Sequence, residues 1–136
     1  MATESGNVLR AAALSGLERR VLERFVAQLR EALGDDLRAV WLYGSRARGD
    51  AVLDETDVDR HSDIDLIVIA NGGKRRYDAK VYDIAYGTAL REGANPASYS
   101  IFVHDPEWLR GRREIESFFI QEVDRDKIVL AGSDLA

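Results

Sequence analysis

The stretch that decides the fold runs from Val40 to Ala70, VWLYGSRARGDAVLDETDVDRHSDIDLIVIA. Its pattern is typical of a buried strand, a Gly-Ser turn that enters a helix, an acidic loop and a second apolar strand. Because side chains on a strand alternate between its two faces, Asp63 and Asp65 are expected to point the same way. Two adjacent carboxylates repel each other unless a cation lies between them, and Mg²⁺ prefers oxygen ligands of this kind. The pair therefore predicts a metal site.

The Gly-Ser turn indicates a second site next to the first. Gly44 allows a tight backbone turn, and Ser45 is predicted to be the N-cap of a helix. The N–H groups and the positive dipole end of a helix N-terminus bind phosphate. Arg46 and Arg48 follow in the first turn of that helix. One of them could contact a phosphate, or both could face solvent or pair with Asp50; the sequence favours neither alternative.

Taken together, the two halves resemble the nucleotidyltransferase superfamily of polymerase-beta-like enzymes, in its small stand-alone form. The match is Gly-Ser-x-x-x-Gly at Gly44, Ser45 and Gly49, followed by Asp-x-Asp at Asp63 and Asp65. The resemblance implies an α/β fold in which helices pack on a mixed sheet of about four or five strands.

The same resemblance implies the cofactors and the site residues. It makes Asp63 and Asp65 catalytic residues that hold Mg²⁺, with ATP or another NTP as co-substrate. The residues that would bind the nucleotide are Gly44, Ser45, Arg46, Arg48 and Gly49.

One expected element of the family pattern is absent. Members usually carry a third carboxylate on a further strand that faces the Asp pair. Here that strand is expected over about 98–103, where Ser98 or Ser100 stands in its place. Serine is a weak, neutral ligand and is no general base without help. The third ligand is therefore missing or comes from elsewhere, such as Asp54 or Asp57 in the acidic loop.

Length and composition predict one globular domain over 1–136, in which 1–13 form a loosely ordered lead-in. Of the 136 residues 46% are apolar and 32% charged, and there are no cysteines, so neither a disulfide framework nor a thiolate metal site is expected. This composition fits the cytoplasm. No apolar run is long enough for a membrane span, and a net charge of −5 argues against binding long nucleic acid.

Periodicity predicts the other elements. A Ser15–Glu18 capping box begins a helix that Gly34 ends. A strand is expected over 38–43, and another over 127–131. A second helix follows the NGG turn and ends at Gly93, with a core face of Tyr77, Val81, Ile84, Ala85 and Leu90. The Asp105-Pro106 pair begins a last helix, for which an interruption at Gly111 is considered.

Three functions are consistent with these features. The first is Mg²⁺-dependent transfer of NMP, most simply AMP from ATP, to a hydroxyl of a protein or small molecule. The resemblance adds a helical HEPN-type toxin as a candidate protein partner, for which the chain would be the antitoxin. The second is a catalytically degenerate nucleotide- or metal-binding or interaction module that lacks the third carboxylate. The third is an aminoglycoside-type nucleotidyltransferase, against which the length of the chain counts.

Overall fold

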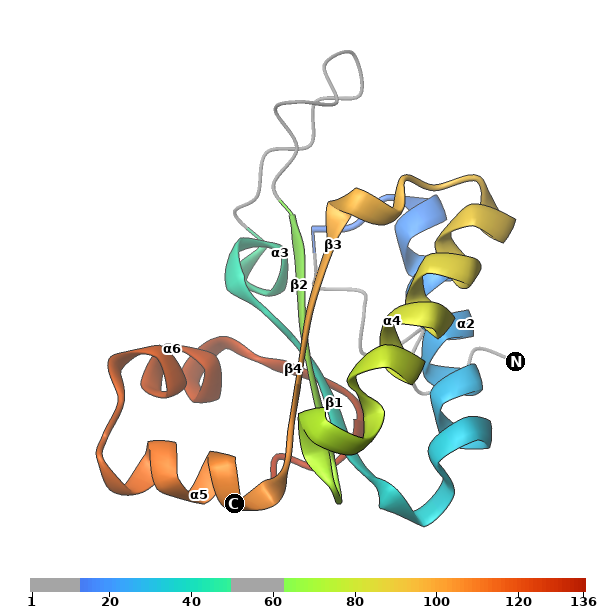
Figure 1. Ribbon diagram of the computed structural model, residues 1–136. Coiled ribbons are helices and arrows are strands. Elements are labelled where there is room, and N and C mark those ends of the chain that lie inside the picture. The colour runs from blue at the N-terminus through green and yellow to red at the C-terminus, as the bar shows by residue number, and fades with distance from the viewer. Residues whose placement is uncertain (1–12, 50–62) are drawn as a thin grey trace.

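The computed structural model describes residues 13–49 and 63–136. Its centre is a four-stranded mixed sheet in the order β3-β2-β1-β4 (Figure 1). The strands are β1 (Leu37–Tyr43), β2 (Ile64–Ala70), β3 (Tyr99–His104) and β4 (Ile128–Gly132). Strand β1 pairs antiparallel with both β2 and β4, whereas β2 and β3 are parallel. The predicted α/β class and strand number are confirmed. The acidic loop with Asp54 and Asp57, and the lead-in before Ala13, lie outside the described residues.

The sheet is covered by helices on both faces, which explains the near-continuous apolar runs of β1 and β2. One face packs against α2 (Gly16–Leu33) and α4 (Gly73–Glu92). Two short 3₁₀ turns, η2 (Gly34–Asp36) and η4 (Pro96–Ser98), lead from these helices into β1 and β3. The buried side chains of this layer include Phe25, Leu29, Val40, Leu66 and Val81. This layer is the larger of two hydrophobic cores.

Helix α2 has the predicted capping box, in which Ser15 Oγ accepts from the Glu18 N–H and Glu18 Oε1 accepts from the Ser15 N–H. Helix α4 ends at Gly93, also as predicted. The assignment of Leu90 to its core face is wrong, since Leu90 is 53% exposed and the neighbouring Thr88 and Ala89 are buried instead. One residue is about 100° of helix rotation, so a small error in phase moves a side chain from the core to the surface.

The opposite face of the sheet packs against α5 (Pro106–Glu114) and α6 (Phe118–Asp126). Asp105 caps α5 and Pro106 occupies its first turn, as expected. The interruption considered at Gly111 is wrong, because α5 passes through it. The break lies at residues 115–117, where Glu116 adopts a φ of 50°. Ile115 in this break and Phe118 at the start of α6 are 69% and 75% exposed.

Strand β4 joins the end of the chain to the sheet by pairing with β1, in register from Leu42↔Ile128 to Ala39↔Gly132. The indole N–H of the fully buried Trp41 donates to the carbonyl of Ser133 at 2.8 Å. A buried indole N–H needs such an acceptor. None of the helices within 13–49 and 63–136 is long and apolar enough to cross a membrane.

Gly132 gives a test of how closely β4 approaches β1. A Cβ there would lie 1.9 Å from the carbonyl oxygen of Arg38, and Gly132 has a φ of 72°. We expect Gly132→Ala to lower the free energy of unfolding by roughly 2–4 kcal/mol, measured by urea denaturation. Gly111→Ala is the matched control: a Cβ there meets nothing within 4 Å, so an alanine in this helix should stabilise the protein by up to about 1 kcal/mol. Equal effects of the two substitutions would contradict the close approach.

Candidate functional site

The two predicted metal ligands lie at the start of β2. Asp63 immediately precedes the strand and is exposed, whereas Asp65 is its second residue and is half-buried. Asp65 stands opposite Tyr43 of β1 and opposite Ser100 of β3. Because Ile67 and Ile69 belong to the smaller core beneath α5 and α6, strand alternation places Asp65 on that same face. The carboxylate therefore lies on an inner strand of the sheet, near the end at which that strand begins.

The electrostatic environment leaves this carboxylate poorly compensated. Burial raises the pKa of Asp65, the charge of Asp63 raises it further, and Arg46 offsets these effects only in part. Burial together with the charge of Asp65 also raises the pKa of the neighbouring Tyr43 hydroxyl. Each shift records a cost of negative charge at this place. A bound cation would remove that cost, which is the physical requirement of a metal site.

Gly44 brings the turn after β1 directly against Asp65. It has a φ of 77°, and a Cβ at this position would lie 2.6 Å from Asp65 Oδ2. Such a distance is too short for any side chain unless the carboxylate moves. Gly44 therefore satisfies both a left-handed backbone conformation and a close approach, as expected of a tight turn beside a binding site.

The cap of the following helix differs from the prediction. Helix α3 (Gly44–Arg48) has Tyr43, not Ser45, as its N-cap residue, and no side chain caps it. The chain is still extended at Tyr43 and turns at Gly44, so the helix begins one residue before the polar side chain that the motif suggested. Gly49 ends α3 with a φ of 81° and donates its N–H to the carbonyl of Ser45 at 3.0 Å.

Arg46 has a structural partner that the sequence analysis missed. Its side chain is only 1% exposed, and its Nη1 lies 2.8 Å from Glu18 Oε1 and 3.0 Å from the carbonyl oxygen of Ala13. The Glu18 oxygen that Arg46 contacts is the same one that closes the capping box of α2. The alternative that both arginines face solvent is therefore wrong for Arg46. The ion pair of Arg46 with Glu18 connects α3 to α2.

Arg48 is the arginine that reaches the surface beside the Gly44 turn. Its side chain is 40% exposed and lies 3.9 Å from Asp126. It also lines a small cavity of about 110 Å³ together with Tyr43, Gly44, Phe119, Glu122 and Val123. The two arginines of the motif thus have different environments. Only Arg48 combines exposure with proximity to the turn.

No third carboxylate stands beside the pair in the described part of the chain. Ser100 occupies the position opposite Asp65, as the strand alternation predicted, whereas Ser98 lies in η4, before the strand. Asp83 is exposed on α4, and Asp105 accepts from the Trp108 N–H at the start of α5. Within 13–49 and 63–136, no group of three or more His, Cys, Asp or Glu side chains could hold a metal ion.

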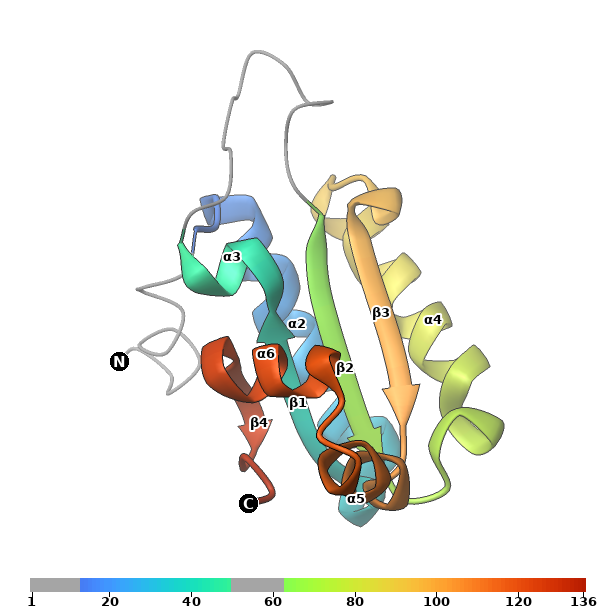
Figure 2. The same ribbon diagram turned by 90° about the vertical axis from the view of Figure 1, so that its left-hand side faces the viewer.

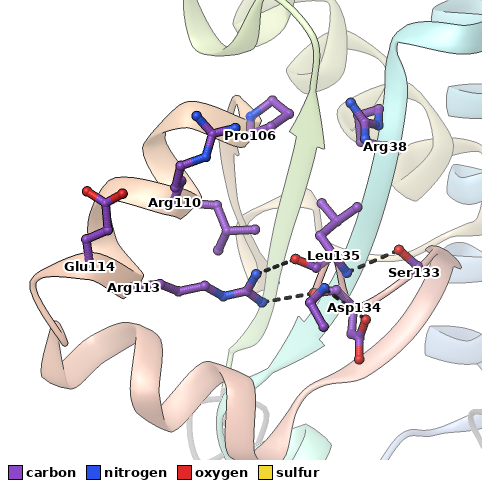
Figure 3. Close-up of a pocket in the computed structure, with 10 residues that line it drawn as sticks. Arg38, Pro106, Arg110, Arg113, Glu114, Ser133, Asp134 and Leu135 are labelled. Atoms are coloured by element: carbon purple, nitrogen blue, oxygen red, sulfur yellow. Dashed lines mark hydrogen bonds between the residues drawn. The ribbon is translucent and has the colours of Figure 1, made fainter.

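A larger cavity of about 770 Å³ lies between α5 and the last residues of the chain (Figure 3). Its lining includes Arg38, which is in the half of β1 that pairs with the end of β2, remote from Asp65. Arg113 closes one side by donating to the carbonyl oxygens of Asp134 and Leu135. Arg113 also pairs with Asp124 of α6, so its charge is already neutralised. This cavity therefore does not belong to the carboxylate site.

Comparisons with known proteins gave a sequence match and a structural match. A relative from Methanocaldococcus jannaschii, named a "putative protein adenylyltransferase", is 40% identical over 78 residues. The match covers 55% of this chain and 48% of the relative, so the chain spans about half the length of this curated relative. A crystal structure of a "putative nucleotidyltransferase" from Sulfolobus solfataricus aligns with 94% of this chain and 87% of that chain, with a TM-score of 0.41 and 19% identity. No family model matches the chain.

The Arg46–Glu18 pair predicts a strong effect on stability. Arg46→Leu leaves a half-buried carboxylate without its cation, so the free energy of unfolding at pH 7 should fall by about 3 kcal/mol. Glu18→Gln should cost less, and the double variant should cost less than the sum of the two. Urea denaturation of the four proteins measures this coupling. Strictly additive losses would contradict it.

The same pair predicts a pH dependence. Burial would raise the pKa of Glu18, but hydrogen bonds from Arg46 and Ser15 and the charge of Arg46 hold it below its ordinary value. A depressed carboxyl pKa stabilises the fold above the ordinary value, and this contribution is lost as the pH falls through the depressed value. Glu18→Gln should therefore lose less stability than the wild type between pH 7 and pH 3.

Asp65 predicts a pH dependence of stability that is opposite in sign to that of Glu18. Because its pKa is raised in the folded state, its ionised form destabilises the metal-free protein at pH 7, and this effect disappears as the pH falls. Asp65→Asn should therefore be more stable than the wild type at pH 7, by about 0.5 kcal/mol or more, with a smaller difference at pH 4. Asp83→Asn, on the surface of α4, is the control and should change little. A less stable Asp65→Asn protein would indicate that Asp65 has a cationic partner.

Proposed function

We propose that the chain belongs to the nucleotidyltransferase superfamily and that it transfers NMP, most simply AMP from ATP, to a hydroxyl group of a protein or small molecule. In this reaction the acceptor oxygen forms a bond to the α-phosphorus, the bond from that phosphorus to pyrophosphate breaks, and the hydroxyl proton leaves. The observation that carries the proposal is the half-buried Asp65, next to Asp63 and in close contact with the Gly44 turn.

Asp63 and Asp65 fit a magnesium ion by the chemistry of their donors and by their charge. Carboxylate oxygens are the ligands that Mg²⁺ prefers, and the raised pKa of Asp65 indicates negative charge that Arg46 compensates only in part. When bound, the ion would offset the charge of the triphosphate and the charge that develops in the transition state. Asp54 and Asp57, which the sequence analysis named as substitutes for the third carboxylate, remain candidates for a further ligand.

The Gly44 turn and Arg48 would bind the β- and γ-phosphates. Gly44 carries no side chain that could obstruct an approaching phosphate, and Ser45 adds a hydroxyl in the same turn. Arg48 supplies an exposed guanidinium, which is suited to phosphate. Arg46 has a different role in this proposal: with Glu18 it holds α3 in place from below.

The described residues also indicate which groups at the site can donate or accept a proton. The raised pKa of Tyr43 keeps its phenol protonated at neutral pH, so Tyr43 can donate a hydrogen bond but does not serve as a base. Ser100 is neutral and does not accept the acceptor's proton unaided. Among the described residues, Asp63 and Asp65 are the carboxylates beside the site that could serve as the base for the acceptor hydroxyl, and the acceptor itself could also bring such a group.

A protein acceptor is the favoured substrate class, because the relative from Methanocaldococcus jannaschii is named as a protein adenylyltransferase. A HEPN-type toxin is one such candidate acceptor, proposed from the family resemblance alone. The second candidate function is a catalytically degenerate nucleotide-binding or interaction module. The serine opposite Asp65, in the place of a carboxylate, favours this alternative.

Calorimetric titration with ATP, with and without Mg²⁺, tests the proposal. We expect Mg²⁺-dependent binding that the Asp63→Asn/Asp65→Asn double variant abolishes. Arg48→Gln should weaken binding about tenfold, since it removes a charged hydrogen bond. Arg110→Gln, an exposed arginine near the distant cavity, is the control and should bind as the wild type does.

Two further outcomes would decide between the alternatives. Transfer of label from α-labelled ATP to a protein acceptor, lost in the double variant, would establish the enzyme. Mg²⁺-dependent binding without transfer to any acceptor would favour the degenerate module. Binding that is indifferent to both aspartates would overturn the site itself.

A further inference from the structure

Three aromatic side chains form a column along β3 and into α5, which we call the aromatic column: Phe102, His104 and Trp108. The rings of Phe102 and His104 have centroids 6.4 Å apart and planes 25° apart. Those of His104 and Trp108 are 3.7 Å apart and nearly parallel, at 3°. The Arg112 guanidinium lies 5.7 Å from the Trp108 ring and covers the far end. Stacked aromatic rings in contact exclude water from their faces, so each ring helps to fix the next.

The near end of the aromatic column is open. Phe102 is 47% exposed although it stands on a strand of the sheet. In Figure 2, α6 lies in front of β1 and α5 crosses the lower end of the sheet, whereas no helix lies in front of β3 above α5. The next residue on this face is Ser100, whose small side chain adds no further ring to the column.

This open end lies beside the carboxylate site. Ser100 is the partner of Asp65 in the parallel pairing of β2 with β3, and Phe102 is the partner of Ile67. Neighbouring strands are about 4.8 Å apart and alternate residues about 6.7 Å apart. The Cα atoms of Phe102 and Asp65 are therefore separated by roughly 8 Å, a distance that a nucleoside monophosphate spans.

We propose that Phe102 binds the base of the nucleotide by stacking, as the next member of the aromatic column. This inference rests on the proposed function, and it assigns the part of the nucleotide that the carboxylates and the Gly44 turn leave unbound. The phosphates approach the turn at the end of β1, and the carboxylates stand at the start of β2. Strand β3 is the next strand after β1 and β2 in the sheet. The nucleoside therefore lies over β3, where Phe102 presents its ring.

The surroundings of Phe102 suit a neutral planar ligand. Burial lowers the pKa of His104, and the charges of Lys74 and Arg112 lower it further against the opposing effect of Asp105 and Asp78. The imidazole is therefore neutral at pH 7, and the ring beneath Phe102 carries no charge. Stacking of a base on an aromatic side chain tolerates every base, because all of them have a π face. Since its neighbours already support Phe102, little side-chain freedom is lost on binding.

The experiment compares ATP with inorganic tripolyphosphate, which has no base, in calorimetric titrations with Mg²⁺. Phe102→Ala should weaken ATP binding about tenfold and leave tripolyphosphate binding unchanged. Phe102→Trp keeps a stacking surface and should retain or improve ATP affinity. Tyr86→Ala, which removes a 59% exposed ring from α4 against the opposite face, is the matched control and should affect neither ligand.

The outcomes separate this inference from the proposed function. If Phe102→Ala binds ATP as the wild type does, or loses both ligands equally, stacking on Phe102 is overturned while the triphosphate site stands. If the wild type binds neither ATP nor tripolyphosphate, the proposed function is overturned and this inference with it. The inference would also be overturned if Tyr86→Ala weakened the binding of ATP, but not of tripolyphosphate, as much as Phe102→Ala does. The effect would then not be specific to Phe102.

Discussion

The constraint on which the site depends is the contact between the Gly44 turn and the Asp65 carboxylate. A single Cβ at Gly44 would come within 2.6 Å of Asp65 Oδ2, so the turn can lie this close to strand β2 only because the residue is glycine. Two further interactions maintain it. The Tyr43↔Asp65 pairing fixes the register of β1 and β2, and the buried pair of Arg46 with Glu18 fixes α3 against α2. The geometry at one end of the sheet thus depends in part on α2, which contributes neither of the two candidate metal ligands, Asp63 and Asp65.

The two faces of the sheet contribute differently to stability and function. The face beneath α2 and α4 holds the larger core, and its side chains are almost entirely apolar. The face beneath α5 and α6 holds fewer buried side chains. It also bears Asp65, whose raised pKa marks an energetic cost, and Phe102, whose ring remains in contact with solvent. The protein thus concentrates its stability on one face and tolerates unfavourable groups on the other, as expected of a functional surface.

Sequence patterns predicted the features that depend on neighbouring residues. The Ser15–Glu18 capping box and the glycine ends of α2 and α4 follow from spacings of a few residues, whereas the choice of Ser98 or Ser100 as the residue opposite Asp65 came from the family resemblance. The role of Arg46 could not be predicted, because its partner Glu18 is 28 positions away and only the folded chain brings them together. The same holds for the aromatic column, in which His104 and Trp108 meet only because the chain turns between β3 and α5. The prediction of one last helix was wrong at residues 115–117, where the positive φ of Glu116 separates α5 from α6.

The pairing of β4 with β1 has a consequence for folding during synthesis. Strand β1 belongs to the first third of the chain, whereas its partner on one side comes from residues 128–132. During synthesis β1 stays unpaired on that side until residues 128–132 have left the ribosome, and the indole of Trp41 lacks its acceptor until Ser133 has done so. Contacts so distant in sequence form slowly, and an unpaired apolar strand is prone to aggregate in the meantime. The nascent chain is therefore vulnerable until β4 emerges, and the burial of Trp41 marks the end of that period.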